Sequence, residues 1–347
     1  MNKQITPLIT IGLTTYNRPN FLQESVQSVI NQKYKNFKLI IGNDYPESKV
    51  TFETLGIDYD SRIDIINFKE NIGEVNNLNY LLNQAESDWF TWLADDDIFH
   101  ESFLDSMIKS LENTTNNIIA VYSPYVSGKN PNDKFFNQNL SQNSMQLTAV
   151  DFISKYLLRE FYIVGCYGLM NTKKLKKIGG FPSLGPSEGS YGDTIIPILL
   201  SEHGNINIID NPLVYLRTHL ESYSARIAPL NHYTSAEPDV LIKVSNVCQS
   251  LAPNSFKNKC IYLMVKWFAE SEFAVIFRVQ PGSKPLSFFH KFILLIKLLI
   301  YQLKVNYPRI KIRYWLSYTL FIIRLLFRLW LSYPLHIIRL LFRFFFP

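Results

Sequence analysis

Residues 89–97 read WFTWLADDD, a mostly apolar run followed directly by three consecutive aspartates, Asp95, Asp96 and Asp97. An apolar run of this length between polar segments is typical of a buried β-strand. Adjacent carboxylates repel one another and are costly to bury at the end of such a strand, so a cation is expected to balance their charge. Mg²⁺ and Mn²⁺ suit this role because they prefer oxygen ligands. The alternative is an acidic helix N-terminus, which needs only one aspartate.

Strand and helix patterns alternate on both sides of this stretch. Apolar residues at helical spacing predict helices at residues 20–32, 73–85, 101–112 and 148–160. Apolar runs of strand length predict strands at residues 8–14, 38–41, 63–68, 89–94 and 118–126. The alternation predicts an α/β fold with a Rossmann-like, mainly parallel sheet and helices on both faces. Ligands bind at the carboxyl ends of the strands in such sheets, which is where the three aspartates lie.

The later part of the chain has weaker patterns. Residues 128–146 are polar and rich in turn formers, which predicts a surface loop. Residues 206–216 predict two short extended segments, and residues 236–278 predict two helices. We therefore divide the chain into an α/β domain at residues 1–220, a helical extension at residues 221–285 and a tail at residues 286–347.

The net charge of +6 is distributed unevenly over the 347 residues. Residues 1–272 contain 23 basic and 29 acidic residues, whereas residues 273–347 contain 12 basic and no acidic ones. A nucleic-acid-binding protein normally has its basic patch on the folded domain, so we expect no nucleic-acid partner. An acidic globule with a basic, apolar tail instead favours binding to an anionic membrane surface.

The tail contains a tandem repeat, because residues 315–329 and 330–344 match at 12 of 15 positions. A membrane-spanning helix needs about 20 apolar residues, and basic residues interrupt both repeats. Their spacing predicts helices that lie flat in the membrane surface, with Trp315 and Trp330 near the lipid headgroups. Residues 1–7 show no signal-peptide pattern, and the three cysteines suggest no disulfide framework. We therefore expect a peripheral or monotopic protein on the cytoplasmic face of the cell membrane.

Polar motifs also follow the first two predicted strands. Residues 14–18 (TTYNR) could hold a ring and a phosphate. The pair Asn43-Asp44 ends the second strand, where its carboxylate can accept a hydrogen bond from a ligand, although Asn-Asp is also common in turns. The sequence has no G-x-G-x-x-G, P-loop or H-E-x-x-H motif, which disfavours the dinucleotide-binding, ATPase and zinc-protease classes.

Taken in order, these motifs resemble the family 2 glycosyltransferases of GT-A fold over about residues 7–220. Residues 14–18 are similar to the family's first-strand motif, with Thr14 in the place of a common proline. Asp44 matches the aspartate that binds the nucleotide base. Residues 71–79 resemble the start of the family's next helix, with Leu78 in place of its arginine. The three aspartates fall on the D-x-D motif, which binds a metal and the diphosphate of a nucleotide-sugar.

Two later segments extend the resemblance. Gly192-Asp193 opens an apolar helix where the family has Glu-Asp with its catalytic base. Residues 215–219 (YLRTH) resemble the family's Tyr-Arg-x-His element, which closes on the diphosphate or the metal. The resemblance thus implies a catalytic Asp193, a Mn²⁺ or Mg²⁺ cofactor and a nucleotide-sugar donor. It implies donor contacts from Thr14, Tyr16, Arg18, Asp44, Asp95 and Asp96, and the metal ligands Asp95, Asp97 and His219.

The activity implied by the resemblance is that of a metal-dependent, inverting hexosyltransferase. It would move a sugar from a nucleotide-sugar, with a UDP-sugar favoured, to a saccharide or lipid-linked acceptor hydroxyl at the membrane surface, in polysaccharide or glycan synthesis. One alternative is a related transferase that acts on a polyprenyl phosphate. Another is a catalytically inactive, membrane-bound scaffold of the same fold, which the four retained aspartates argue against.

Overall fold

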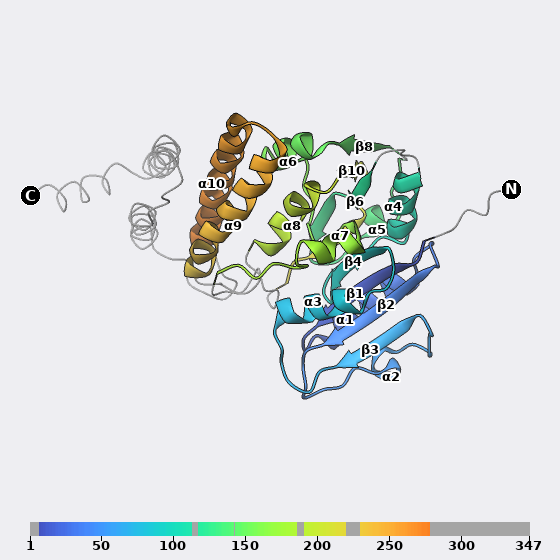
Figure 1. Ribbon diagram of the computed structural model, residues 1–347. Helices are drawn as coiled ribbons and strands as arrows, with labels where there is room; N and C mark the ends of the chain where they lie inside the picture. Colours follow the sequence, from blue (N-terminus) through green and yellow to red (C-terminus); the bar gives the residue numbers. More distant parts are fainter. Residues whose placement is uncertain (1–6, 113–116, 142, 186–190, 220–229, 278–347) are drawn as a thin grey trace, which may run out of the picture. The chain divides into compact units, whose positions relative to one another are not determined.

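The computed structural model describes residues 7–112, 117–141, 143–185, 191–219 and 230–277 (Figure 1). The chain divides into two compact units, Met1–Lys257 and Asn258–Pro347. The first unit contains both sheets, and of the second unit only part of helix α10 (Asn254–Phe277) is described. The tail and both predicted domain boundaries, at residues 220 and 285, lie outside the described residues. Within the described ranges, no helix combines the length and apolar character that crossing a membrane requires.

The first unit is built on an eight-stranded sheet in the order β3-β2-β1-β4-β9-β6-β10-β8 (Figure 1). Strands β3, β2, β1 and β4 are parallel, and so are β6 and β10. Strand β9 is antiparallel to both neighbours, and β8 is an antiparallel edge strand. The predicted α/β class with a mainly parallel sheet is therefore confirmed. The bounds are β1 Ile9–Thr15, β2 Phe37–Asn43, β3 Ile63–Asn67, β4 Trp89–Ala94, β6 Ile118–Tyr122, β8 Ser144–Leu147, β9 Leu169–Asn171 and β10 Asn205–Ile209.

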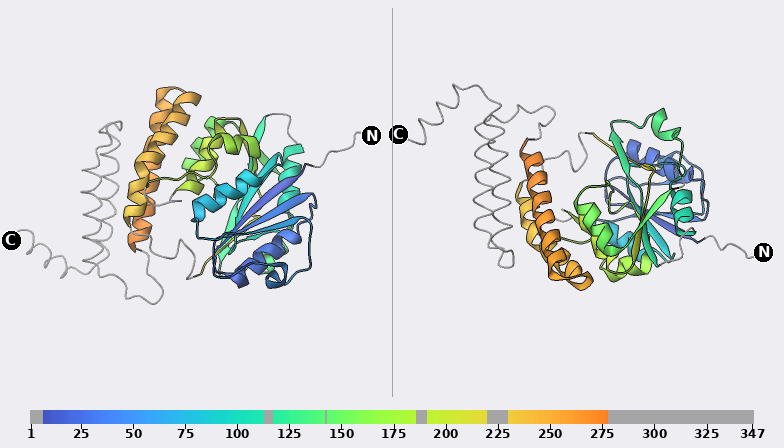
Figure 2. Two further views of the ribbon diagram at one scale, coloured as in Figure 1. Left: turned by 60° about the horizontal axis from the view of Figure 1, so that its bottom comes forward. Right: turned by 90° about the horizontal axis from the view of Figure 1, so that it is seen from above.

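Helices cover both faces of this sheet (Figure 2). On one face, Ile9, Ile11 and Leu13 of β1 share a buried cluster with apolar residues of α1 and α4. On the other face, α3 packs so closely that a Cβ on Gly12 would contact Leu81. The bounds are α1 Pro19–Ile30, α2 Phe52–Leu55, α3 Glu74–Gln84, α4 Phe103–Glu112, α5 Asp133–Phe136, α6 Ala149–Leu157, α7 Thr172–Lys177, α8 Gly192–Ser201 and α9 Leu230–Leu251.

A second sheet of three strands, in the order β5-β11-β7, positions the later part of the chain. Strand β5 (Ile98–Phe99) follows the three aspartates directly, and β11 (Val214–Arg217) pairs with it in the antiparallel direction. Strand β7 (Tyr125–Gly128) is parallel to β11. The pairing of β11 with β5 places residues 214–217 beside the three aspartates, although more than a hundred residues separate them in the sequence.

Two predictions in this region are wrong. The single strand predicted at residues 118–126 is two strands, β6 in the large sheet and β7 in the small one. Pro124 lies between them, and a proline has no backbone N–H with which to continue a ladder. The loop predicted at residues 128–146 contains the short helix α5 and the edge strand β8. The sequence patterns also do not predict β9 or α7, which are only three and six residues long.

Candidate active site

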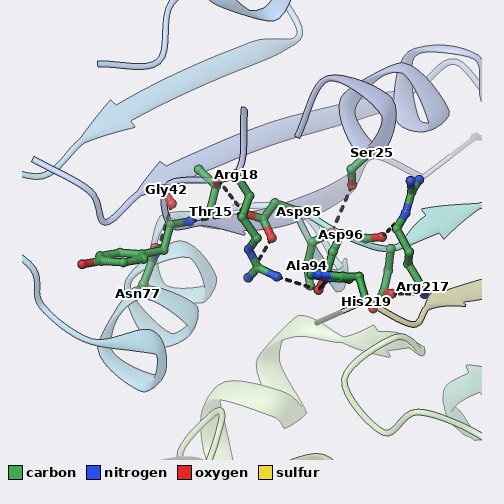
Figure 3. A network of polar contacts seen from close by, with 12 residues as sticks. Thr15, Arg18, Ser25, Gly42, Asn77, Ala94, Asp95, Asp96, Arg217 and His219 are labelled. Carbon is green, nitrogen blue, oxygen red and sulfur yellow. Dashed lines mark hydrogen bonds and ion pairs between the residues drawn. The ribbon is translucent and has the colours of Figure 1, made fainter. Parts of the chain in front are cut away.

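The carboxyl ends of β1 and β4 meet because these strands are parallel neighbours, with Thr14 opposite Ala94. Asp95 follows β4 and is fully buried. Its Oδ2 accepts hydrogen bonds from the Thr15 hydroxyl at 2.7 Å and from the Tyr16 backbone N–H at 3.2 Å. Its Oδ1 lies 2.9 Å from Arg18 Nη2 (Figure 3). Asp95 therefore holds the segment that follows β1 against the end of β4.

Within the aspartate cluster (Asp95, Asp96 and Asp97), Asp96 contacts both Arg18, which follows β1, and His219, which follows β11. Its Oδ2 lies 2.6 Å from Arg18 Nη1 and 2.8 Å from His219 Nε2 (Figure 3). The side chains of Asp96 and His219 keep 11% and 13% of their surface exposed. Both are therefore accessible to a ligand, unlike the fully buried side chain of Asp95.

Asp97 is buried and is held by protein donors on both carboxylate oxygens. Oδ1 accepts the Arg217 backbone N–H at 2.9 Å, and Oδ2 accepts the Tyr167 hydroxyl at 2.5 Å. The Arg217 side chain donates to the Asp96 carbonyl at 3.0 Å and pairs with Glu24 at 2.6 Å. Strand β11 is thus fixed to the aspartate cluster by both its backbone and its arginine.

Burial makes the negative charge of this cluster costly. Desolvation raises the pKa of the Asp95 carboxyl to about 7, although Arg18 opposes the shift. Burial, and then the neighbouring charge of Asp96, raise the pKa of Asp97 to about 7. Burial alone would lower the pKa of Arg18, but the charges of Asp95 and Asp96 raise it above its ordinary value. The site therefore has more carboxylate charge than its nearest cation balances.

These residues fit a divalent cation that also takes ligands from a bound substrate. Mg²⁺ in proteins is commonly held by one or two carboxylates together with substrate phosphates. Among the described residues, no three His, Cys, Asp or Glu side chains are grouped so that they could hold a metal by themselves. Protein donors contact Asp95 and Asp97, and the predicted metal ligands Asp95, Asp97 and His219 stay a prediction. The structure also pairs Asp96 with His219.

The other predicted donor contacts lie at the ends of β1 and β2. Tyr16 is 44% exposed, and its ring packs edge-to-face against Tyr45 at 5.2 Å. Thr14 is partly buried inside β1, between β2 and β4. Asp44 is buried, and its two carboxylate oxygens accept the backbone N–H groups of Ile72 at 2.7 Å and Gly73 at 2.9 Å. Its predicted contact with a nucleotide base stays a prediction, and it also anchors the start of α3.

Asp193 lies in the first turn of α8, and its side chain is exposed to solvent. The protein atoms that surround it nevertheless desolvate it enough to raise the pKa of its carboxyl. Glu74, the first residue of α3, is likewise exposed and has a raised pKa through desolvation, with Arg18 opposing the shift and Asp96 and Asp193 adding to it. The charges of Asp96 and Asp193 thus both raise the pKa of Glu74, and the role of Asp193 as the base stays a prediction.

Three further residues at the site, Glu24, Tyr167 and Glu74, are not indicated by the sequence motifs. Glu24 and Tyr167 reach the cluster only through the fold, and no motif marks them. Glu74 directly follows residues 71–73, which resemble the start of a helix in the family, and an acidic residue at that helix start is the signal that could identify it.

A parallel α/β sheet with an acidic cluster at the carboxyl end of a central strand is the arrangement of the GT-A glycosyltransferases. Residues 10–179 match the family model described as Glycosyl transferase family 2, and this part of the chain belongs to that family. The match includes the aspartate cluster and ends before Asp193 and His219.

Similar proteins support this assignment. The chain is 30% identical over 178 residues to an uncharacterized glycosyltransferase of Rickettsia typhi, covering 51% of this chain and 54% of that protein. It is 29% identical over 176 residues to one of Methanocaldococcus jannaschii, covering 50% and 58%. The chain thus spans about half the length of these curated relatives. In fold it is similar to residues 1–349 of S. aureus TarS, with a TM-score of 0.59 and 14% identity, covering 87% of this chain and 81% of that one.

Proposed function

We propose that this chain transfers a sugar from a nucleoside diphosphate sugar to an acceptor hydroxyl, with inversion at the anomeric carbon. The observation that carries the proposal is the pairing of Asp96 with Arg18 and His219 at the carboxyl end of β4. Charged groups of both signs at this position suit a diphosphate and its counter-ion. S. aureus TarS, which is similar in fold, has been crystallised with UDP and with UDP-GlcNAc, so a UDP-sugar is the donor we propose first.

Asp96 and His219 would hold the Mn²⁺ or Mg²⁺ ion, which supplies charge neutralisation for the diphosphate when bound. Arg18 adds a guanidinium that remains charged at any working pH and lies against the same aspartate. The exposed ring of Tyr16, set against Tyr45, offers an aromatic surface for the base. In this proposal the metal ion and Arg18 both bind the diphosphate of the donor, and the ring of Tyr16 stacks on its base.

Asp193 acts as the general base in this proposal. Its carboxylate takes the proton of the acceptor hydroxyl while that oxygen forms a bond to the anomeric carbon. The bond from the anomeric carbon to the diphosphate breaks, and the diphosphate leaves with the electron pair. A carboxyl whose pKa is raised by its surroundings suits this role, because a base works best when its pKa approaches the working pH.

The acceptor we propose is a saccharide or lipid-linked hydroxyl at the cytoplasmic face of the membrane. In this proposal the basic tail binds the membrane and so holds the enzyme near the acceptor. The experiment that tests the function incubates the purified full-length chain with a panel of UDP-sugars and measures UDP release with Mn²⁺ and with EDTA. Saccharide and polyprenyl phosphate acceptors are separate arms, and NMR of the product reports the anomeric configuration. We expect metal-dependent release and an inverted product. Failure to bind any nucleotide-sugar would instead support the inactive scaffold.

A further inference from the structure

The first turn of α8 has an unusual backbone arrangement at Asp193. Pro197 lies four residues later inside the same helix. A proline has no N–H to donate to the carbonyl four residues before it, and its ring presses against that carbonyl. The Asp193 carbonyl therefore lacks its ordinary partner within the helix.

Gly165 lies directly against this carbonyl. A Cβ on Gly165 would be 1.7 Å from the Asp193 carbonyl oxygen and 2.7 Å from Pro197 Cδ. Real Cβ atoms do not come this close to other atoms, and neither a backbone carbonyl nor a proline ring can rotate away. Gly165 is not among the glycines with positive φ, so space rather than backbone conformation requires a glycine here.

The segment that carries Gly165 is also fixed to the strands beside the aspartate cluster. The Tyr122 hydroxyl of β6 donates to the Gly165 carbonyl at 3.3 Å, and the Trp92 backbone N–H of β4 donates to the Cys166 carbonyl at 3.2 Å. The next residue, Tyr167, donates to Asp97. Three consecutive residues thus connect the first turn of α8 to the strand that ends in the aspartates.

We propose that Gly165 and Pro197 are positioning residues for Asp193. Their close contact fixes the first turn of α8 against residues 165–167, and this sets where the Asp193 carboxylate lies relative to the aspartate cluster. The inference rests on the proposed function, in which Asp193 is the base. General-base catalysis depends on a placement accurate to a fraction of an ångström, and a misplacement of about 1 Å can cost roughly 100-fold in rate.

The test compares Gly165→Ala and Pro197→Ala in the full-length chain, with Gly12→Ala as the matched control. A Cβ on Gly12 of β1 would lie 2.8 Å from the Phe90 ring and 3.1 Å from Leu81, so this variant overpacks the large sheet at a place away from α8 and residues 165–167. We expect Gly165→Ala to lower kcat by about 10- to 100-fold and to change the donor KM by less than about threefold. Gly12→Ala should lower the Tm with a much smaller effect on kcat. Equal kcat losses in the two variants would overturn the proposal.

Pro197→Ala keeps the proposal testable if Gly165→Ala does not fold. It restores an N–H for the Asp193 carbonyl, so it should lower kcat without lowering the Tm. Each variant is then combined with Asp193→Asn, because a residue that acts through Asp193 adds little further loss once the base is gone. Fully multiplicative losses would show that Gly165 and Pro197 act elsewhere. If Asp193→Asn alone leaves kcat unchanged, the proposed base is wrong, which is a separate outcome.

Discussion

Asp96 differs from its two neighbours because its carboxylate is shared by an arginine and a histidine. We expect Asp96→Asn to abolish Mn²⁺-dependent donor binding and to lower kcat by at least about 100-fold, because a neutral amide is a poor metal ligand. Titration of UDP into the variant with and without Mn²⁺ measures the effect. Its Tm should stay close to that of the parent protein. If UDP binding still depends on Mn²⁺ in the variant, Asp96 is not a metal ligand.

Tyr167 donates the hydrogen bond that compensates a buried oxygen of Asp97. Removing a donor to a buried charged acceptor costs about 1.5–3 kcal/mol of unfolding free energy, so Tyr167→Phe should destabilise the protein. The loss should be larger at pH 8 than at pH 5.5, because the pKa of Asp97 is about 7 and its carboxyl is mainly ionised only at the higher pH. Denaturant unfolding at both pH values tests this.

Tyr122→Phe is the control for that measurement, since its buried hydroxyl contacts an uncharged carbonyl at 3.3 Å. Its cost in unfolding free energy should be smaller and should not depend on pH over this range. A cost for Tyr167→Phe that is the same at both pH values would mean that the hydrogen bond does not stabilise the ionised form of Asp97.

At the scale of elements, Asp44 joins the end of β2 to the start of α3 through two backbone hydrogen bonds. Asp44→Asn keeps one acceptor oxygen and removes a negative charge from a helix N-terminus, where such charges stabilise. We expect the unfolding free energy to fall by about 1–2 kcal/mol even without nucleotide. Denaturant unfolding of the nucleotide-free variant measures this, and UDP titration is run in parallel. Weaker UDP binding with unchanged stability would make Asp44 a ligand contact alone.

The elements that the sequence predicts well are those with a long, uniform pattern. Strand β4 lies at the predicted residues, because six consecutive residues suit a strand buried between two neighbours. Pro124 is a signal that the strand ends there, but the apolar residues on both sides of it favour a single strand. Strand β9 has three residues and pairs with strands far away in sequence, so no local pattern could indicate it.

The site shows the same limit. The aspartate cluster is recognisable in the sequence as a functional candidate because three adjacent carboxylates directly follow an apolar strand, whereas Asp193 becomes a candidate only through its place in the resemblance to the family. Which aspartate faces the ligand is not recognisable, since that depends on how the chain turns after β4. The contact between Asp96 and His219 exists only because β11 pairs with β5, and that pairing joins residues separated by more than a hundred positions. Gly165 carries no motif at all.

At the scale of the whole molecule, pH and divalent metal should affect stability together. Asp95 and Asp97 have folded-state pKa values of about 7 against an ordinary 3.8. Between these values the folded protein binds more protons than the unfolded chain, so these residues contribute less stability as the pH rises from about 4 to 7. Mn²⁺ balances the ionised cluster, so the increase in Tm that it causes over EDTA should be larger at pH 7.5 than at pH 5. If Mn²⁺ raises the Tm by the same amount at pH 7.5 and at pH 5, the metal does not balance the charge of the aspartate cluster.

The tail, residues 286–347, gives a second prediction at this scale. Each basic residue near an anionic membrane contributes about 1 kcal/mol of binding free energy. The apolar faces between the basic residues strengthen binding further by inserting into the membrane interface. We expect the full-length chain to sediment with vesicles that contain anionic lipid and much less with neutral ones. A chain truncated after Gly282 should remain in the supernatant with both. Protease protection of a tail segment on the far side of the vesicle would show that it spans the membrane.

Asp97 and Arg217 are 120 residues apart in the sequence, and we therefore expect their contact to form late as the chain folds. Strands β1 to β4 can pair while residues 180–219 are still being synthesised, and at that stage the aspartates are open to water. Loop-closure entropy delays contacts between such distant residues, so the docking of β11 should follow the rate-limiting step. Substitutions in β11 should accordingly accelerate unfolding while leaving the folding rate nearly unchanged.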